Sequence, residues 1–338
     1  MLLASFYTGE NQPSTERGEE RCDTLSSTPT PGGDDALALM MMLMDSGVQV
    51  EAVTTVFGNV DLEQATQNAL ATLELMGGEL PPVYKGAPRP LLREPLTTVH
   101  AHGSDGMGDC GLVHPRIAPQ KGHAVDIICQ LAKRFPGELE ILMIGPATNV
   151  ALALMKEPEA MRGVKHIYSM GTGGYSLGME TAVAEFNVLV DAEAYDAVLQ
   201  SGIPLTIAGF DLCLGETAFS AQDLDLLNRS GTALASFVVQ SNRVLLEMAT
   251  ARLGYPTVPL PDALAAAAAL WPDTVLEAED RFCYTCYREE ATYGQVIPFL
   301  PNAVATAGGY QNRPANTRLI KRMDAALFKE RILKMLLQ

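Results

Sequence analysis

The stretch PGGDDALAL, residues 31–39, places a glycine turn and two adjacent carboxylates before an apolar helix that we expect to end at Gly47. A helix N-terminus carries partial positive charge and unpaired N–H groups, so carboxylates are favoured there. Asp34 and Asp35 are therefore either ordinary helix-start residues or members of a functional site. Polar residues elsewhere in the chain are needed to decide between these two interpretations.

Outward from this stretch, apolar β-branched runs alternate with helical patterns. The strand-like runs are residues 48–59, 138–145, 166–172 and 205–210, and the helical patterns between them are 61–78, 146–155 and 192–202. Beyond about residue 210 the chain is mainly helical, with helices expected at 232–251, 263–270 and 327–336. This alternation predicts an α/β fold of the Rossmann-like kind, with a mostly parallel central sheet flanked by helices.

Ligands of such sheets bind beyond the carboxyl ends of the strands, so the turns there are candidate sites. These turns hold Asn59, His102, Glu185 and Asn187, and Asp262 opens the alanine-rich helix. Each residue also has a simpler interpretation. Asn59 fits a turn, His102 an ordinary loop, and Asp262 a helix N-cap, while Glu185 and Asn187 fit solvent-facing positions beside Phe186.

Composition and charge limit the classes of partner and the cellular compartment that we expect. The 338 residues are 47% hydrophobic and carry a net charge of −16, which disfavours nucleic acid and anionic membrane as partners. No apolar run approaches the roughly 20 residues that span a bilayer, and the N-terminus is unlike a secretory signal. Cys283 and Cys286 form a single CxxC, a weak zinc signal that we interpret as structural thiols. We therefore expect a cytoplasmic protein.

Several segments together resemble one family. PGGDDALAL resembles the end of the nucleoside hydrolase signature, Asp-x-Asp-Pro-Gly-x-Asp-Asp-Ala. Further similar segments follow in the family's order: AVTTVFGN (52–59), HGSDGMG (102–108), GPATNVALAL (145–154), MGTGGY (170–175), AEFNVLVDAEA (184–194) and PDALAAA (261–267). The chain is thus similar to inosine–uridine-preferring nucleoside hydrolases over residues 31–338, which we expect to form one nucleoside hydrolase domain.

The resemblance implies an enzyme, an N-glycosyl hydrolase that cleaves ribonucleosides to ribose and free base with a bound Ca²⁺ ion. Calcium prefers six to eight oxygen ligands, which carboxylates, backbone carbonyls and substrate hydroxyls can supply. The ion would fix the ribose and activate water, and carboxylates would stabilise an oxocarbenium-like transition state. The resemblance also implies a homo-oligomer, either a dimer or a tetramer, with a ribonucleoside as substrate.

Roles follow from the resemblance one residue at a time. Asp35, Asp262 and the backbone carbonyl of Ile144 match the metal ligands, and Asp262 also contacts substrate. Asp34 matches an acceptor for a ribose hydroxyl. Asp35 and Asn59 match catalytic positions, Asn59 holding the ribose or the attacking water. Glu185 and Asn187 match residues on the 5′ side of the ribose, and His102 matches a histidine near the base.

The chain departs from the family pattern at the start of the signature. Thr28 and Thr30 stand where the family has its Asp-x-Asp, and the Thr30 position normally supplies both a metal ligand and the general base. Threonine has neither the charge nor a suitable pKa for that work. We therefore expect the chain as written to be inactive or nearly so. The alternative function is a catalytically inactive protein that binds ribose or nucleosides.

The strand that should precede the signature is missing as well. The codons ATC ATC GAC ACC GAC for Ile-Ile-Asp-Thr-Asp, read from the second base, give Ser-Ser-Thr-Pro-Thr, which is the sequence of residues 26–30. We therefore hypothesise a reading-frame change and expect residues 1–30 to be a non-native or disordered segment. A competing hypothesis starts the motif at Asp23 with an inserted loop, but it still lacks the apolar strand.

Two further departures concern the substrate. Pro261 stands where some members have a histidine that protonates the leaving base, and proline has no proton to donate. Met179 stands where many members have a ribose-binding asparagine. The sequence therefore leaves the preferred base and the leaving-group acid undetermined.

Overall fold

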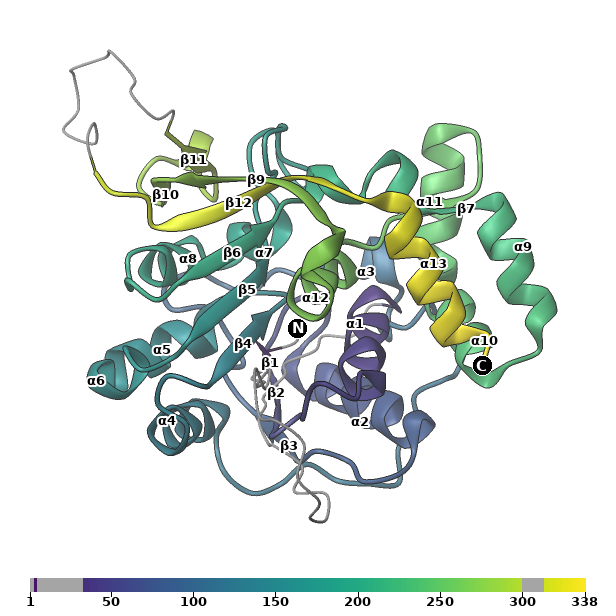
Figure 1. The fold of residues 1–338 in the computed structure, drawn as a ribbon, viewed down its shortest axis with the longest axis horizontal. Coiled ribbons are helices and arrows are strands. Elements are labelled where there is room, and N and C mark those ends of the chain that lie inside the picture. The colour runs from purple at the N-terminus through teal and green to yellow at the C-terminus, as the bar shows by residue number, and fades with distance from the viewer. Residues whose placement is uncertain (1–2, 5–32, 300–312) are drawn as a thin grey trace, which may run out of the picture.

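The fold is built on a six-stranded sheet of order β1-β4-β5-β6-β12-β9, as seen in a computed structural model that describes residues 3–4, 33–299 and 313–338 (Figure 1). Its strands are β1 (Leu3–Ala4), β4 (Glu140–Met143), β5 (His166–Met170), β6 (Leu205–Ala208), β9 (Val275–Arg281) and β12 (Thr317–Met323). Strands β4, β5, β6 and β12 run parallel, whereas β1 and β9 pair antiparallel at the two ends. The mostly parallel sheet expected from the sequence is confirmed.

Both faces of this sheet are covered by helices, which explains why its central strands are apolar on both sides. Ile141 and Leu142 follow each other on β4 and contribute to opposite apolar clusters, because successive side chains of a strand point to opposite faces. One cluster contains α1 and α12, and the other contains α4, α5 and α8, and Figure 1 shows the two groups on opposite sides of the sheet.

The helices of the first group and of the C-terminal half are α1 (Gly33–Met44), α2 (Leu62–Met76), α9 (Ala221–Ser230), α10 (Ala233–Ser241), α11 (Arg243–Leu253), α12 (Pro261–Leu270) and α13 (Ala325–Leu336). The others are α3 (Val99–His102), α4 (Ala124–Arg134), α5 (Thr148–Lys156), α6 (Pro158–Met161), α7 (Phe186–Leu189) and α8 (Ala192–Leu199). Helix α12 packs against both α1 and the sheet strands β5 and β6. It therefore fixes the position of α1 over the sheet.

Among the described residues, three short strand pairs lie outside the six-stranded sheet. They are parallel β2 (Val53–Thr55) with β3 (Val83–Lys85), antiparallel β7 (Phe219–Ser220) with β8 (Thr257–Val258), and antiparallel β10 (Cys283–Thr285) with β11 (Val296–Pro298). Strand β1 contacts both β2 and β4, so the two-residue β1 lies between the β2–β3 pair and the main sheet. The expected strand at 48–59 is thus much shorter than its apolar run.

One helix prediction is wrong. The helix expected over 232–251 is divided at Asn242 into α10 and α11. Asn242 has φ −97° and ψ 11°, and its side-chain Nδ2 donates to the carbonyl of Val238 at 2.9 Å. Short polar side chains that bond to nearby backbone compete with helix geometry in this way. The other predicted helices and strands are present, and apart from the strand expected at 48–59 their ends differ by a few residues.

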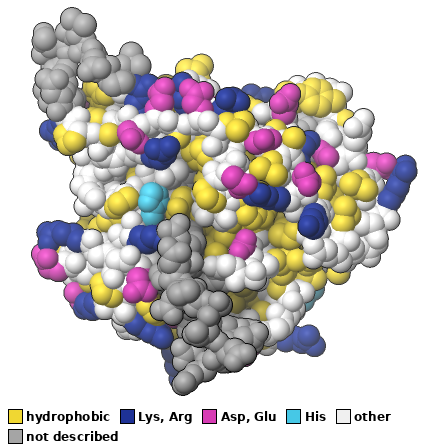
Figure 2. Space-filling view, viewed as in Figure 1, with side chains coloured by type: hydrophobic (Ala, Val, Ile, Leu, Met, Phe, Trp, Pro, Cys, Tyr) yellow, Lys and Arg dark blue, Asp and Glu magenta, His cyan; other side chains and the backbone are white. Residues whose placement is uncertain are grey.

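The expectation that residues 1–30 are non-native or disordered concerns a segment of which only Leu3–Ala4 lies within the described residues. Thr28 and Thr30 lie outside them. Within the described part of the chain, no helix is both long and apolar enough to cross a membrane. Acidic and basic side chains are interspersed over β9 and β12 (Figure 2), where Lys321 Nζ contacts Glu277 and Glu279 at 2.8 and 2.9 Å.

Asn149 is a testable link between the β2–β3 pair and α5. Its Nδ2 donates to Thr55 O at 3.0 Å, its Oδ1 accepts from Ala87 N at 2.9 Å, and it is buried. We expect Asn149→Ala to lower the free energy of unfolding by about 3 kcal/mol, because two buried backbone groups lose their partners. Urea unfolding measures this change. Asn228→Ala on the exposed face of α9 is the matched control, and equal losses in the two variants would contradict the prediction.

Candidate metal centre

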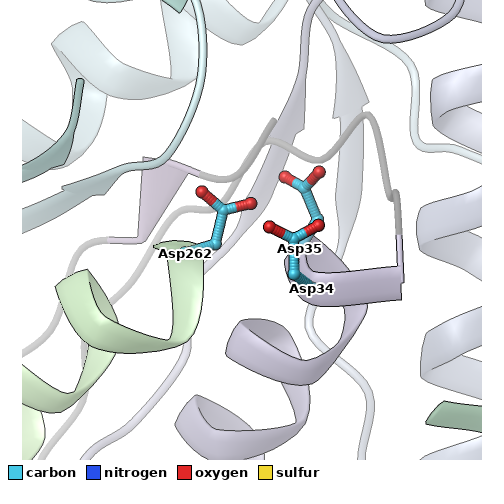
Figure 3. A group of neighbouring side chains, drawn as sticks. All are labelled: Asp34, Asp35 and Asp262. Carbon is cyan, nitrogen blue, oxygen red and sulfur yellow. The ribbon is translucent and has the colours of Figure 1, made fainter. Parts of the chain in front are cut away.

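The N-termini of α1 and α12 meet at one point, and each supplies carboxylates to it (Figure 3). Asp34 and Asp35 lie in the first turn of α1, and Asp262 is the second residue of α12. One carboxylate oxygen from each of the three residues lies within 4.8 Å of the other two. Two segments more than two hundred residues apart in sequence therefore form one acidic cluster.

This cluster is almost inaccessible to solvent, with Asp34, Asp35 and Asp262 exposed by 4%, 1% and 4%. Burial raises the pKa of all three carboxyls, and their mutual repulsion raises the pKa of Asp35 and Asp262 further. Asp34 shares a hydrogen bond with Asp262, yet Asp34 Oδ1 accepts none from the described residues. A hard divalent cation would relieve the repulsion and bind the unused oxygen, so these residues fit such an ion.

The interpretation of Asp262 as a helix N-cap is wrong. Leu260, not Asp262, is the N-cap of α12, and Pro261 occupies the first helical position, where its missing N–H costs no hydrogen bond. Asp34 and Asp35 lie in a first turn as expected, but they are buried rather than solvated. Buried like charges at two helix starts are costly to folding unless something neutralises them.

Asn59 and His102 are connected through the start of α3. Asn59 Oδ1 accepts from Thr98 Oγ1 at 2.6 Å, and Asn59 O accepts from Thr98 N at 3.1 Å. His102 is the last residue of α3 and is half-buried. Burial lowers the pKa of His102 to about 4, against the opposing effect of the Asp35 charge. His102 is therefore neutral at physiological pH and lies within electrostatic reach of the cluster.

Glu185 and Asn187 are buried at the carboxyl ends of β4 and β5 rather than exposed to solvent. Glu185 is the N-cap of α7, and its two oxygens accept from Asn187 N at 2.9 Å and Val188 N at 3.2 Å. Burial raises the pKa of Glu185 to about 7. Asn187 Nδ2 donates to Ile144 O at 3.3 Å, which leaves that carbonyl a second lone pair for another partner.

Two residues near this centre were not predicted from the sequence. Thr172 follows β5 with φ 72°, a conformation that β-branched residues rarely adopt, and its backbone N–H bonds to Glu185. Such conformations concentrate at functional sites. Asn242 packs against Gly33, the first residue of α1. The glycine-rich run MGTGGY gave a weak signal for Thr172, but nothing in the sequence placed Asn242 next to Gly33.

The chain matches a known protein family and several relatives in it. Residues 30–330 match the family model described as inosine-uridine preferring nucleoside hydrolase. The chain is 34% identical over 250 residues to the pyrimidine-specific ribonucleoside hydrolase RihA of Citrobacter koseri, covering 74% of this chain and 80% of that protein. It is 40% identical over 212 residues to an uncharacterized protein of Schizosaccharomyces pombe, covering 62% and 68% of the two chains.

Solved structures give the same answer for the fold. A plant nucleoside hydrolase superposes with a TM-score of 0.86 at 25% identity, covering 91% of this chain and 97% of its own. An inosine-guanosine nucleoside hydrolase superposes with a TM-score of 0.80 at 26% identity, covering 91% and 97%. The chain therefore belongs to the inosine-uridine preferring nucleoside hydrolases, a family of metal-dependent enzymes that hydrolyse the N-glycosidic bond of ribonucleosides.

Proposed function

We propose that this protein is a calcium-dependent ribonucleoside hydrolase whose activity is impaired by the sequence that precedes Pro31. The observation that carries the proposal is the cluster of three buried carboxylates from α1 and α12, with one oxygen of each within 4.8 Å of the others. Its relatives include both a pyrimidine-specific ribonucleoside hydrolase and an inosine-guanosine nucleoside hydrolase. We therefore name ribonucleosides as the substrate class and no single base.

The donor set fits a hard divalent cation, and the family resemblance favours calcium as that ion. The cluster offers oxygen atoms only, whereas zinc sites commonly include histidine nitrogen or cysteine sulfur. In our proposal Asp35, Asp262 and the carbonyl of Ile144 hold the ion, and Asn187 orients that carbonyl through its 3.3 Å hydrogen bond. When bound, the ion supplies Lewis-acid chemistry toward the ribose hydroxyls and water.

The surrounding side chains then position the nucleoside. Asp34 accepts a hydrogen bond from a ribose hydroxyl, and the link to Thr98 holds Asn59 where it contacts the ribose or the attacking water. Glu185 and Asn187 bind the 5′ side of the ribose from the start of α7. His102 lies beside the base as a neutral imidazole, since burial keeps its pKa low. The carboxylates also stabilise positive charge that develops on the ribose.

Two features limit catalysis in this chain. Thr30 stands at the general-base position and has no titratable group in the useful range. Pro261 starts α12 and cannot protonate the leaving base. These features favour a second candidate function, a catalytically inactive protein that binds nucleosides through the remaining site residues.

The domain organisation, the assembly and the cellular compartment of the protein are proposals as well. We propose that residues 31–338 form a single nucleoside hydrolase domain, that residues 1–30 are a non-native or disordered addition to it, and that the protein assembles as a homo-oligomer. The cysteines among the described residues are free thiols, which supports a reducing compartment such as the cytoplasm.

Restoring the first strand tests the functional proposal. We expect the chain as written to release little or no ribose from inosine and uridine. Replacing residues 26–30 with Ile-Ile-Asp-Thr-Asp should raise ribose release by a factor of at least about 10³, because it restores both a strand and the base. A reducing-sugar assay measures the product, with and without a chelator.

The controls separate the two candidate functions. Thr30→Asp alone restores a carboxylate without the strand, and we expect it to remain nearly inactive. If the five-residue replacement folds and binds nucleoside but releases no ribose, the inactive binding protein is the correct function. Ribose release that is insensitive to the chelator would contradict metal dependence.

Calcium affinity should depend on pH in a defined direction. The raised pKa values of Asp34, Asp35 and Asp262 mean that the ion must displace protons, so binding strengthens as pH rises from about 5 to about 8. Without metal, the sign for stability is opposite. The folded state holds more protons than the unfolded state, so this cluster lowers stability as pH rises above the ordinary aspartate range. Calorimetric titration and thermal unfolding at several pH values measure both effects, and a pH-independent affinity would refute the prediction.

A further inference from the structure

The first residue of α1 is in unusually close contact with the break between α10 and α11. A Cβ atom built on Gly33 would lie 2.1 Å from Asn242 Nδ2 and 2.3 Å from Asn242 Cγ. No Cβ approaches other atoms that closely, so the Asn242 amide occupies the space that a side chain at position 33 would need. Glycine is required at position 33 for space, and the occupant of that space is Asn242.

In this position only one end of the Asn242 side-chain amide has a hydrogen-bond partner among the described residues. Asn242 is 2% exposed, and while its Nδ2 donates to Val238 O, its Oδ1 has no hydrogen-bond partner among the described residues. A buried amide oxygen without a partner is unfavourable, and an apolar side chain of similar size would avoid this cost. The amide also interrupts what would otherwise be one continuous helix.

The residues beside Asn242 contact a second segment of the candidate site. Arg243 donates from Nε at 3.1 Å and from Nη2 at 2.8 Å to Gly108 O. Gly108 N in turn donates to His102 O at 2.9 Å, and a Cβ on Gly108 would lie 2.3 Å from Gln240 O. Residues 240–243, which we call the α10–α11 junction, therefore pack against both the start of α1 and the segment that follows His102.

We propose that Asn242 is a positioning residue, which holds the first turn of α1 so that Asp34 and Asp35 face Asp262 at cation-binding distance. The proposal rests on the proposed function. The effect of Asn242 passes through Gly33, the residue immediately before Asp34. Because Arg243 holds the His102 segment from the same junction, the break between α10 and α11 sets the spacing of the acidic cluster and the base-binding side together.

A four-member cycle in the full-length chain tests this contact: the parent, Gly33→Ala, Asn242→Ala and the double variant. In Gly33→Ala the added methyl group collides with the Asn242 amide, and in Asn242→Ala the start of α1 loses its support. We therefore expect each single variant to weaken calcium binding about tenfold or more. In the double variant the methyl group fills the vacated space. Calcium affinity should return to within about threefold of the parent. Isothermal titration calorimetry measures the affinity, and thermal unfolding gives Tm for each member.

A matched destabilised variant separates positioning from a general loss of stability. Val198→Ala in α8 removes buried side-chain volume on the opposite face of the sheet. We expect it to lower Tm while leaving calcium affinity within about twofold of the parent, since the sheet separates α8 from α1. A purely structural role for Asn242 predicts instead that affinity follows Tm in all variants. Additive losses in the double variant, or full affinity in Gly33→Ala, would also overturn the proposal.

Crystal structures of the same four proteins distinguish this inference from the proposed function. If the parent binds no calcium, the calcium assignment fails, but the position of α1 is still measurable. In the parent, one carboxylate oxygen of each of Asp34, Asp35 and Asp262 lies within 4.8 Å of the other two. We expect these oxygens to move farther apart in Gly33→Ala and to return to the parent distances in the double variant. An unchanged cluster in Gly33→Ala would show that Asn242 does not position it.

Discussion

The candidate site depends on apolar packing that keeps three carboxylates together in a place from which water is excluded. Burial and mutual repulsion both oppose their charged forms, so the carboxylates do not draw α1 and α12 together. Apolar packing does, because residues 263–267 of α12 are almost wholly inaccessible and mostly alanine, whose small side chains allow close approach to α1 and to the sheet. The hydrophobic core therefore supports an arrangement of charge that is unfavourable until a cation neutralises it.

Much of this fold follows from sequence periodicity, because buried parallel strands and their covering helices have distinct patterns. The runs at 138–145 and 166–172 became β4 and β5, and the alanine-rich segment became α12. The pattern failed at one helix. Residues 232–251 have a helical pattern throughout, but the helix is divided at Asn242, whose side chain bonds to Val238 O and packs against Gly33, a residue more than two hundred positions away.

The residues of the candidate site could be predicted from the sequence only in part. Asp34, Asp35 and Asp262 were identified from a family resemblance, and the structure brings them together. Chemical type alone would not have found them, since paired aspartates at helix starts are common for reasons unrelated to metals. Asn242 and Thr172 could not be found by motif, because their importance lies in space and backbone conformation. The capping role of Glu185 was also missed, as it depends on where α7 begins.

The proposed reading-frame change before Pro31 would affect both the fold and the chemistry. Strand β2 is buried along its length, as is β4, and between them the described chain provides only the two residues of β1, paired antiparallel in a region of parallel strands. A parallel strand entering this space and ending at Pro31 would place its last side chains next to Asp34 and Asp35, because ligands gather at the carboxyl ends of such strands. The residues that complete the sheet and the residue that supplies the base would then be close neighbours in the sequence. On the proposed reading-frame change, those few codons would carry both the strand and the base, so we expect a threonine-to-aspartate substitution alone to restore the carboxylate without the strand.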